Sequence, residues 1–165
     1  MGIAIVLISL LTGLFLIFGA PSFLAEQQGS LAAAASYSFF HANLWHLCIN
    51  SVAIWGLYAR RKASKPVKDL AIAYVIAVLV SPLSALPPIG FSNVIYALIG
   101  LRTPAFSAPW WRRYPVWLFL GISAALIPFP QVSALAHLTA FAIAVGWASL
   151  RRFYLDLTAD ARKYL

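Results

Sequence analysis

The feature that most constrains this chain is the placement of its positive charges between long apolar segments. All 12 lysines and arginines fall into three clusters, and every second connection between apolar segments holds none. The clusters are Arg60, Arg61, Lys62, Lys65 and Lys68; Arg102, Arg112 and Arg113; and Arg151, Arg152, Arg162 and Lys163. The hydrophobic fraction is 62%, against about 45–50% in soluble domains, so the sequence predicts an integral membrane protein.

The apolar segments predict six membrane spans within a single all-α domain covering residues 1–165. The spans cover residues 3–19, 39–58, 70–86, 92–101, 115–127 and 133–150. The fourth and fifth are shorter than the roughly 20 residues that a helix needs to cross a bilayer alone. We therefore expect the fourth to be surrounded by other helices, which would cover its ends at hydrocarbon depth.

The charge clusters orient these spans. Cytoplasmic loops carry the excess of lysine and arginine, so the three clusters predict that both termini lie in the cytoplasm. The clusters are explained by topology, and we expect no nucleic-acid partner. The first span lacks a positive n-region and a strong cleavage site, so we expect it to stay in the mature protein. A bacterial cytoplasmic membrane is the expected location.

Polar side chains within membrane spans are costly, which makes them candidates for function. The second span contains "HANLWHLCIN", with His41, His46 and Asn50; the fourth begins at Ser92, and the sixth contains His137. The predicted orientation places His46 about 10 Å and His137 about 6 Å below the outer edge. Three helices thus present polar groups at one level in the outer half of the bilayer.

This set of residues suggests acyl-transfer chemistry. A serine becomes a nucleophile when a neutral histidine takes its proton, and His137 lies at the depth of Ser92. His46 and Asn50, four residues apart on one helix face, offer donors for an oxyanion. Tyr96 lies one turn below Ser92 and can support the imidazole. No carboxylate lies at this depth, so a Ser-His dyad is the implied form.

Structural roles are the alternatives for these residues. Ser92 opens a helix after "PPIG" and could be its N-cap. His46 and Asn50 could join helices by hydrogen bonds. Five helical positions separate His41 from His46 by about 140°, so the two rings would not easily share a metal. We expect a structural role for His41.

Together, these motifs resemble those of the rhomboid intramembrane serine proteases. The matching patterns are His-x4-His-x3-Asn from His41, Gly-x-Ser and Tyr-Ala-Leu-x-Gly from Gly90, and the Ala-His pair that ends at His137. The resemblance implies a six-helix bundle with a short central fourth helix. It also implies that Ser92 is the nucleophile, His137 the base, His46 and Asn50 the border of the oxyanion hole, and Tyr96 the support of the histidine.

Three features depart from the family pattern. Asn93 replaces the glycine that usually follows the serine, and Ala140 and Ala144 replace a Gly-x3-Gly pair on the last span. Alanine still allows close helix approach. The first outer loop, residues 20–38, is short and lacks the Trp-Arg pair common in the family.

The expected function is cleavage of transmembrane segments of membrane proteins near the outer face, without a metal or cofactor. The alternative is a rhomboid-fold pseudoprotease that binds such segments without cutting them. A transporter is disfavoured, since polar residues do not continue through the inner half. Cys48 is the only cysteine, which excludes an internal disulfide. The sequence does not indicate an oligomeric state or a particular substrate.

Overall fold

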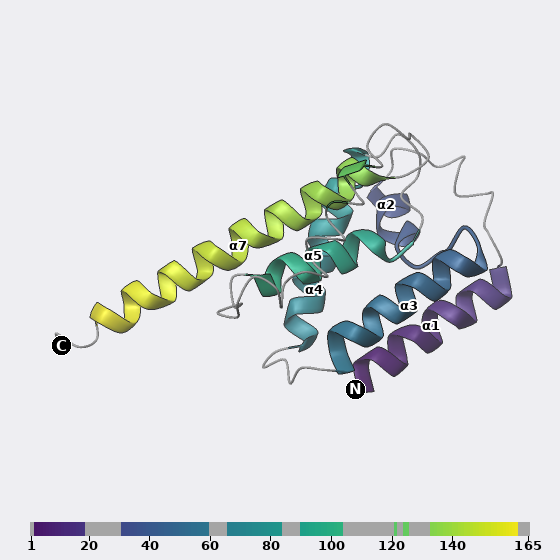
Figure 1. The fold of residues 1–165 in the computed structure, drawn as a ribbon, viewed down its shortest axis with the longest axis horizontal. Helices are drawn as coiled ribbons and strands as arrows, with labels where there is room; N and C mark the ends of the chain where they lie inside the picture. Colours follow the sequence, from purple (N-terminus) through teal and green to yellow (C-terminus); the bar gives the residue numbers. More distant parts are fainter. Residues whose placement is uncertain are drawn as a thin grey trace.

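The computed structural model describes residues 2–18, 31–59, 66–83, 90–103 and 133–161, together with positions 121, 124 and 125. The described residues form helices and turns and contain no strand, in agreement with the all-α prediction (Figure 1). The elements are α1 (Gly2–Phe18), α2 (Leu31–Tyr37), α3 (Leu44–Ala59), α4 (Pro66–Val80), the 3₁₀ turn η2 (Ser81–Leu83), α5 (Ser92–Arg102) and α7 (Ala134–Ala161).

Five of the predicted spans coincide with helices, namely α1, α3, α4, α5 and α7. The fifth predicted span, residues 115–127, falls almost entirely outside the described residues. Among the described residues, two helical segments are long and apolar enough to cross a bilayer, Pro66–Leu83 and Ala134–Ala159, and α1 is a shorter apolar helix. The short helix α2 lies within the segment predicted to be the first outer loop, residues 20–38, and was not predicted.

The predicted start of the second span, residue 39, was wrong by five residues, because α3 begins at Leu44. The Asn43 side chain explains the difference. Its Oδ1 accepts a hydrogen bond from the His46 backbone N–H at 2.9 Å, which satisfies one of the free donors at the helix N-terminus. His41 therefore lies in a turn before the helix, and its angle to His46 is not set by helical periodicity.

The last helix is longer than predicted. α7 contains 28 residues and continues to Ala161, beyond residue 150, where the sixth predicted span ends. At 1.5 Å per residue this corresponds to about 42 Å, which exceeds the roughly 30 Å hydrocarbon core of a bilayer. Its C-terminal part extends beyond the rest of the molecule (Figure 1).

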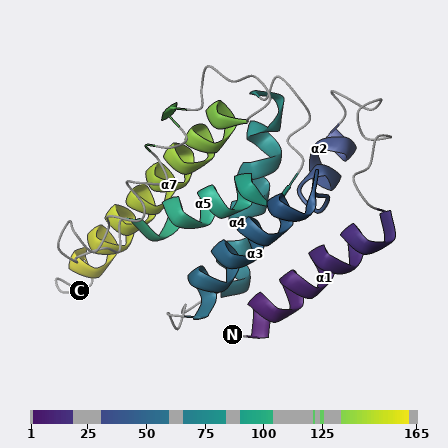
Figure 2. The same ribbon diagram turned by 45° about the vertical axis from the view of Figure 1, so that its right-hand side comes forward.

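The short helix α5 is the centre of the fold, with α3, α4 and α7 packed around it (Figures 1 and 2). Seven of its 11 residues are buried. The buried residues include Val94, Ile95 and Leu98, each at most 1% exposed. The surrounding helices thus cover a helix that is too short to cross a bilayer alone, as the sequence predicted.

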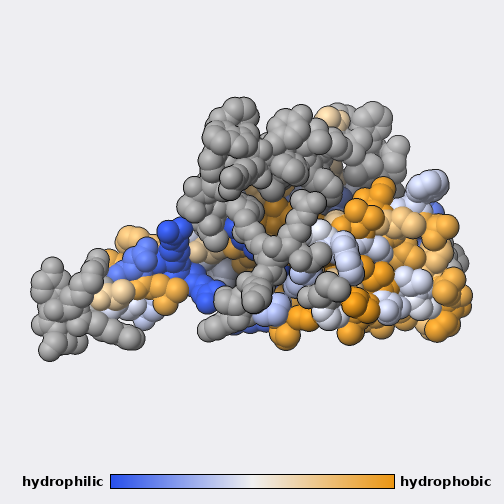
Figure 3. Space-filling model, turned by 60° about the horizontal axis from the view of Figure 1, so that its bottom comes forward, coloured by the Kyte–Doolittle hydropathy of each residue, from blue (hydrophilic) through white to orange (hydrophobic). Residues whose placement is uncertain are grey.

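The outer surfaces of the surrounding helices are apolar. Large hydrophobic side chains are exposed along α1, α3 and α4, including Val6, Leu16, Ile17, Trp45, Val52, Val67 and Leu79. Hydrophobic residues dominate the side of the molecule formed by these helices, and hydrophilic residues gather where α7 leaves the body (Figure 3). A surface of this kind is suited to lipid, because exposed apolar patches on this scale are rare in soluble monomers.

The cations of the described helices lie at the end of the bundle opposite Ser92. Arg102 ends α5 and its Nη1 donates a hydrogen bond of 2.6 Å to the Leu57 carbonyl in the last turn of α3. Its guanidinium also lies over the Tyr58 ring, 4.8 Å from the centroid. The bond satisfies a carbonyl that has no partner within its own helix, so Arg102 ties the ends of α3 and α5 together.

A close approach of α5 to α7 depends on Gly100. A Cβ atom at this position would lie 2.5 Å from the Phe141 carbonyl oxygen and 2.7 Å from the Ala144 Cβ. Ala136, Ala140 and Ala144 are completely buried on the facing side of α7. Small residues on both helices therefore set the distance between their axes.

We expect Gly100→Ala to lower stability, because the new methyl group meets backbone that cannot rotate away. Overpacking of this kind costs about 1–3 kcal/mol. Gly56→Ala in α3 is the matched control, since nothing lies within 4 Å of a Cβ there and alanine favours a helix. The measurement is thermal unfolding in detergent. Equal melting temperatures for the two variants would contradict this account of the packing.

Candidate active site

The backbone before α5 places Ser92 at the start of the helix. Gly90 has φ +114°, a conformation that L side chains rarely adopt, and its N–H donates to the Tyr37 carbonyl at 3.0 Å. Phe91 is the N-cap, and no side chain caps the helix. Ser92 is therefore the first helical residue, and its hydroxyl does not serve as the N-cap that the sequence allowed.

The Ser92 hydroxyl lies next to His137. Its Oγ is 2.8 Å from His137 Nε2, and both residues are partly exposed. They are 45 positions apart in the sequence and lie on α5 and α7. In the tautomer that carries its proton on Nδ1, the imidazole accepts a hydrogen bond from the hydroxyl. Figures 1 and 2 show the ends of α5 and α7 that bring them together.

The Tyr96 ring supports this imidazole from below. The two rings are stacked with centroids 4.6 Å apart and an interplanar angle of 2°. Tyr96 is buried, and it lies one helical turn after Ser92 on the same face. The aromatic contact fixes the plane of the imidazole without a carboxylate.

His46 lies against the turn that precedes Ser92. A Cβ on Gly90 would fall 2.3 Å from His46 Cε1, so the imidazole occupies the space that a side chain would need. The ring is partly exposed. Gly90 is thus required twice, for its backbone conformation and for the approach of His46, and sequence reasoning had used it only as part of a motif.

Asn50 is paired with His41 within the bundle. Its Nδ2 lies 2.9 Å from His41 Nε2, and the two residues are 3% and 0% exposed. The His41 ring also contacts the His46 ring edge to face, with centroids 5.3 Å apart. No hydrogen bond joins Asn50 to Ser92 among the described residues. The His41–Asn50 pair was not predicted; Asn43 as a helix N-cap was the signal that His41 lies outside the helix.

Asn93 points into the protein and not toward the exposed side of Ser92. It is 2% exposed, and its Oδ1 has no hydrogen-bond partner among the described residues. Among the described residues, no group of three or more His, Cys, Asp or Glu side chains is able to hold a metal ion. The polar side chains described around Ser92 are a hydroxyl, imidazoles and amides.

Backbone donors are concentrated beside the Ser92 hydroxyl. The first intrahelical bond of α5 is Ile95 N–H to the Phe91 carbonyl at 3.0 Å. The N–H groups of Ser92, Asn93 and Val94 precede it and have no partner within the helix. The helix dipole adds partial positive charge at this end, which favours a developing negative charge.

Comparison with known proteins places this geometry in a family. The model of the Rhomboid domain matches residues 28–152, which include all the residues described above around Ser92. No curated protein and no solved structure gave a significant match. The matched region covers about three quarters of the chain. The chain therefore belongs to the rhomboid family.

Proposed function

We propose that this protein is an intramembrane serine endopeptidase that cuts transmembrane segments through Ser92 and His137. The observation that carries the proposal is the 2.8 Å distance between Ser92 Oγ and His137 Nε2. Membership of a family that acts on transmembrane substrates in the bilayer supports it. The Tyr96 ring stacks on the imidazole. This contact orients the histidine, as the aspartate of a Ser-His-Asp triad does in soluble serine proteases.

The reaction follows from this geometry. Ser92 Oγ attacks the scissile carbonyl carbon while its proton passes to His137 Nε2. The tetrahedral intermediate then collapses, the C–N bond breaks, and Nε2 returns the proton to the leaving amine. Water then attacks the acyl carbon while its proton passes to Nε2. The bond between that carbon and Ser92 Oγ breaks, Nε2 returns the proton to Oγ, and the second product leaves with a free carboxyl group.

The oxyanion of the intermediate needs donors close to Ser92. The first N–H groups of α5 have no partner within the helix, and the His46 ring is partly exposed. Both are suited to this role. Asn50 is suited to hold the region through His41, since its amide is buried and already bonded. We therefore assign Asn50 a positioning role beside the donor role that the sequence suggested.

The topology fits cleavage near the outer face. In the proposed six-span arrangement, both termini are cytoplasmic and Ser92 lies at the outer end of α5. The described cations lie toward the other end, where Arg102 meets the last turn of α3. A bacterial cytoplasmic membrane is the proposed location. The alternative remains a rhomboid pseudoprotease that binds transmembrane segments, which Asn93 in place of glycine favours.

The first test is cleavage of a model transmembrane substrate in proteoliposomes. We expect Ser92→Ala and His137→Ala each to lower the rate by at least about 10³-fold, because the two residues act as a unit. A fluorophosphonate probe should label wild type and fail to label Ser92→Ala. A folded wild type that neither cleaves nor labels would support the pseudoprotease instead.

Two variants of Tyr96 separate the contribution of ring stacking to the cleavage rate from that of the hydroxyl. Tyr96→Phe retains the ring and should keep most of the cleavage rate, whereas Tyr96→Leu removes the stacked surface and should lower kcat by about fivefold, as loss of one aromatic contact worth ~1 kcal/mol would. The measurement is kcat and KM on the same substrate, with melting temperature as the control for folding. Equal loss in both variants would show that the hydroxyl, and not the ring, matters.

Asn93→Gly restores the residue that the family usually carries. Because Asn93 points inward and its Oδ1 has no partner among the described residues, we expect its removal to keep or raise the cleavage rate. Asn93→Ala is the companion variant, since it keeps helix propensity. Abolished cleavage in both folded variants would assign the Asn93 amide an active role.

A further inference from the structure

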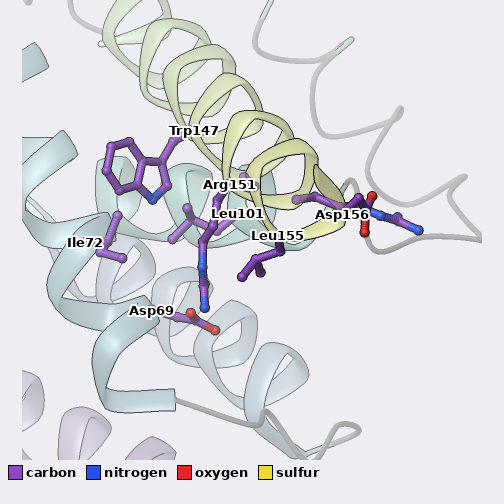
Figure 4. A pocket seen from close by; sticks show the side chains of 9 residues that line it. Asp69, Ile72, Leu101, Trp147, Arg151, Leu155 and Asp156 are labelled. Atoms are coloured by element: carbon purple, nitrogen blue, oxygen red, sulfur yellow. The ribbon is translucent and has the colours of Figure 1, made fainter. Parts of the chain in front are cut away.

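We propose that the protein binds a phospholipid with a phosphoethanolamine headgroup in a pocket at the cytoplasmic end of α4, α5 and α7. The pocket has a volume of about 400 Å³ and lies far from Ser92. Its walls combine charged residues of both signs with aliphatic side chains and a tryptophan (Figure 4). The proposal rests on the topology and is independent of the chemistry at Ser92.

The depth of the pocket matches the inner leaflet. On α7, Arg151 follows His137 by 14 positions, which is about 21 Å along the helix axis. On α4, Asp69 lies in the first turn, at the end that the charge pattern assigns to the cytoplasm. The pocket therefore lies at the level where phospholipid headgroups meet the hydrocarbon core.

The polar side of the pocket carries both signs of charge. The Arg151 side chain points toward Asp69 from the facing helix (Figure 4). Arg152 and Asp156 line the same pocket, one turn apart on α7. The chain holds only 4 acidic residues against 12 basic ones, so two carboxylates in one pocket are a marked departure from the composition.

The charge pattern selects the headgroup. A guanidinium pairs with a phosphodiester through two parallel N–H donors, which suits Arg151. A primary ammonium can donate hydrogen bonds to the Asp69 carboxylate, whereas a choline headgroup has no N–H donor. The two carboxylates balance the two guanidinium groups, so the pocket lacks the excess of positive charge that would favour a headgroup with a net negative charge. A zwitterion with a phosphate and a primary amine complements both sides.

The apolar side of the pocket suits the upper part of an acyl chain. Ile72, Leu101 and Leu155 line it, and each comes from a different helix. The Trp147 side chain stands at the same pocket and is half exposed. Tryptophan is enriched at the membrane interface, where its ring contacts the acyl region and its N–H stays near polar groups. The pocket thus provides for both parts of a phospholipid.

The test is native mass spectrometry of the full chain in detergent with an equimolar mixture of three lipids of identical acyl chains. The lipids are phosphatidylethanolamine, phosphatidylcholine and phosphatidylglycerol. We expect wild type to retain phosphatidylethanolamine at least about fivefold over each of the other two. Equal retention, or preference for the choline or glycerol lipid, would overturn the proposal, and this result needs no variant to fold.

Variants assign the preference to the pocket. Asp69→Asn should remove the preference of ethanolamine over choline, and Arg151→Gln should lower retention of all three lipids by about tenfold, the scale of one charge-assisted hydrogen bond. Lys68→Gln is the matched control, since Lys68 is exposed beside Asp69 and does not line the pocket. An unchanged preference in folded Asp69→Asn would exclude this pocket as the site.

Discussion

The contact between α5 and α7 is the constraint on which the rest of the structure depends. Two helices can approach this closely only where neither carries a large side chain, and Gly100 faces Ala144 at that point. The same approach, about two turns toward the N-terminus of both helices, brings the hydroxyl of one helix within 2.8 Å of the imidazole of the other. Packing of small residues and the Ser92–His137 pair are therefore two parts of one interface.

Polar groups in the bundle are organised around the cost of leaving them without partners in an apolar medium. The His41–Asn50 pair satisfies one buried amide with one buried ring. The Arg102 guanidinium donates a hydrogen bond to the Leu57 carbonyl and lies over the Tyr58 ring. Ser92, His137 and His46 differ from these groups, because they are partly exposed. Exposure separates the residues that can meet a substrate from those that hold the scaffold.

Sequence reasoning was strongest where hydrophobicity and charge determine structure. The alternation of cations and the apolar runs located α1, α4, α5 and α7, and they implied that α5 is surrounded. The convergence of Ser92, Tyr96 and His137 was predicted from their similar depths in the membrane, which the predicted order and orientation of the spans define. Their roles in catalysis stay a prediction. The prediction was wrong where a capping side chain, and not the apolar run, determines the first residue of a helix. Asn43 starts α3 five residues late, and this placed His41 outside the helix, where periodicity gives no information.

The sequence also could not show which partner each polar side chain takes. His46 and Asn50 share a helix face, yet the His46 ring lies against Gly90 and the Asn50 amide is hydrogen-bonded to His41. Contacts of this kind depend on turns such as Gly90 with its φ of +114°, and on loops whose path a periodic pattern does not encode. The length of α7 was missed for a similar reason, since helical structure continues after the apolar run ends.

The unbroken course of α7 has a mechanical consequence. His137 and Arg151 belong to one rod, so neither can shift without moving the other. A change of about 5° in the axis moves one residue by roughly 2 Å relative to the other over this length, a displacement comparable with the reach of a hydrogen bond. Bilayers of different thickness alter helix tilt. The geometry of the imidazole is therefore linked to the membrane in which the helix lies.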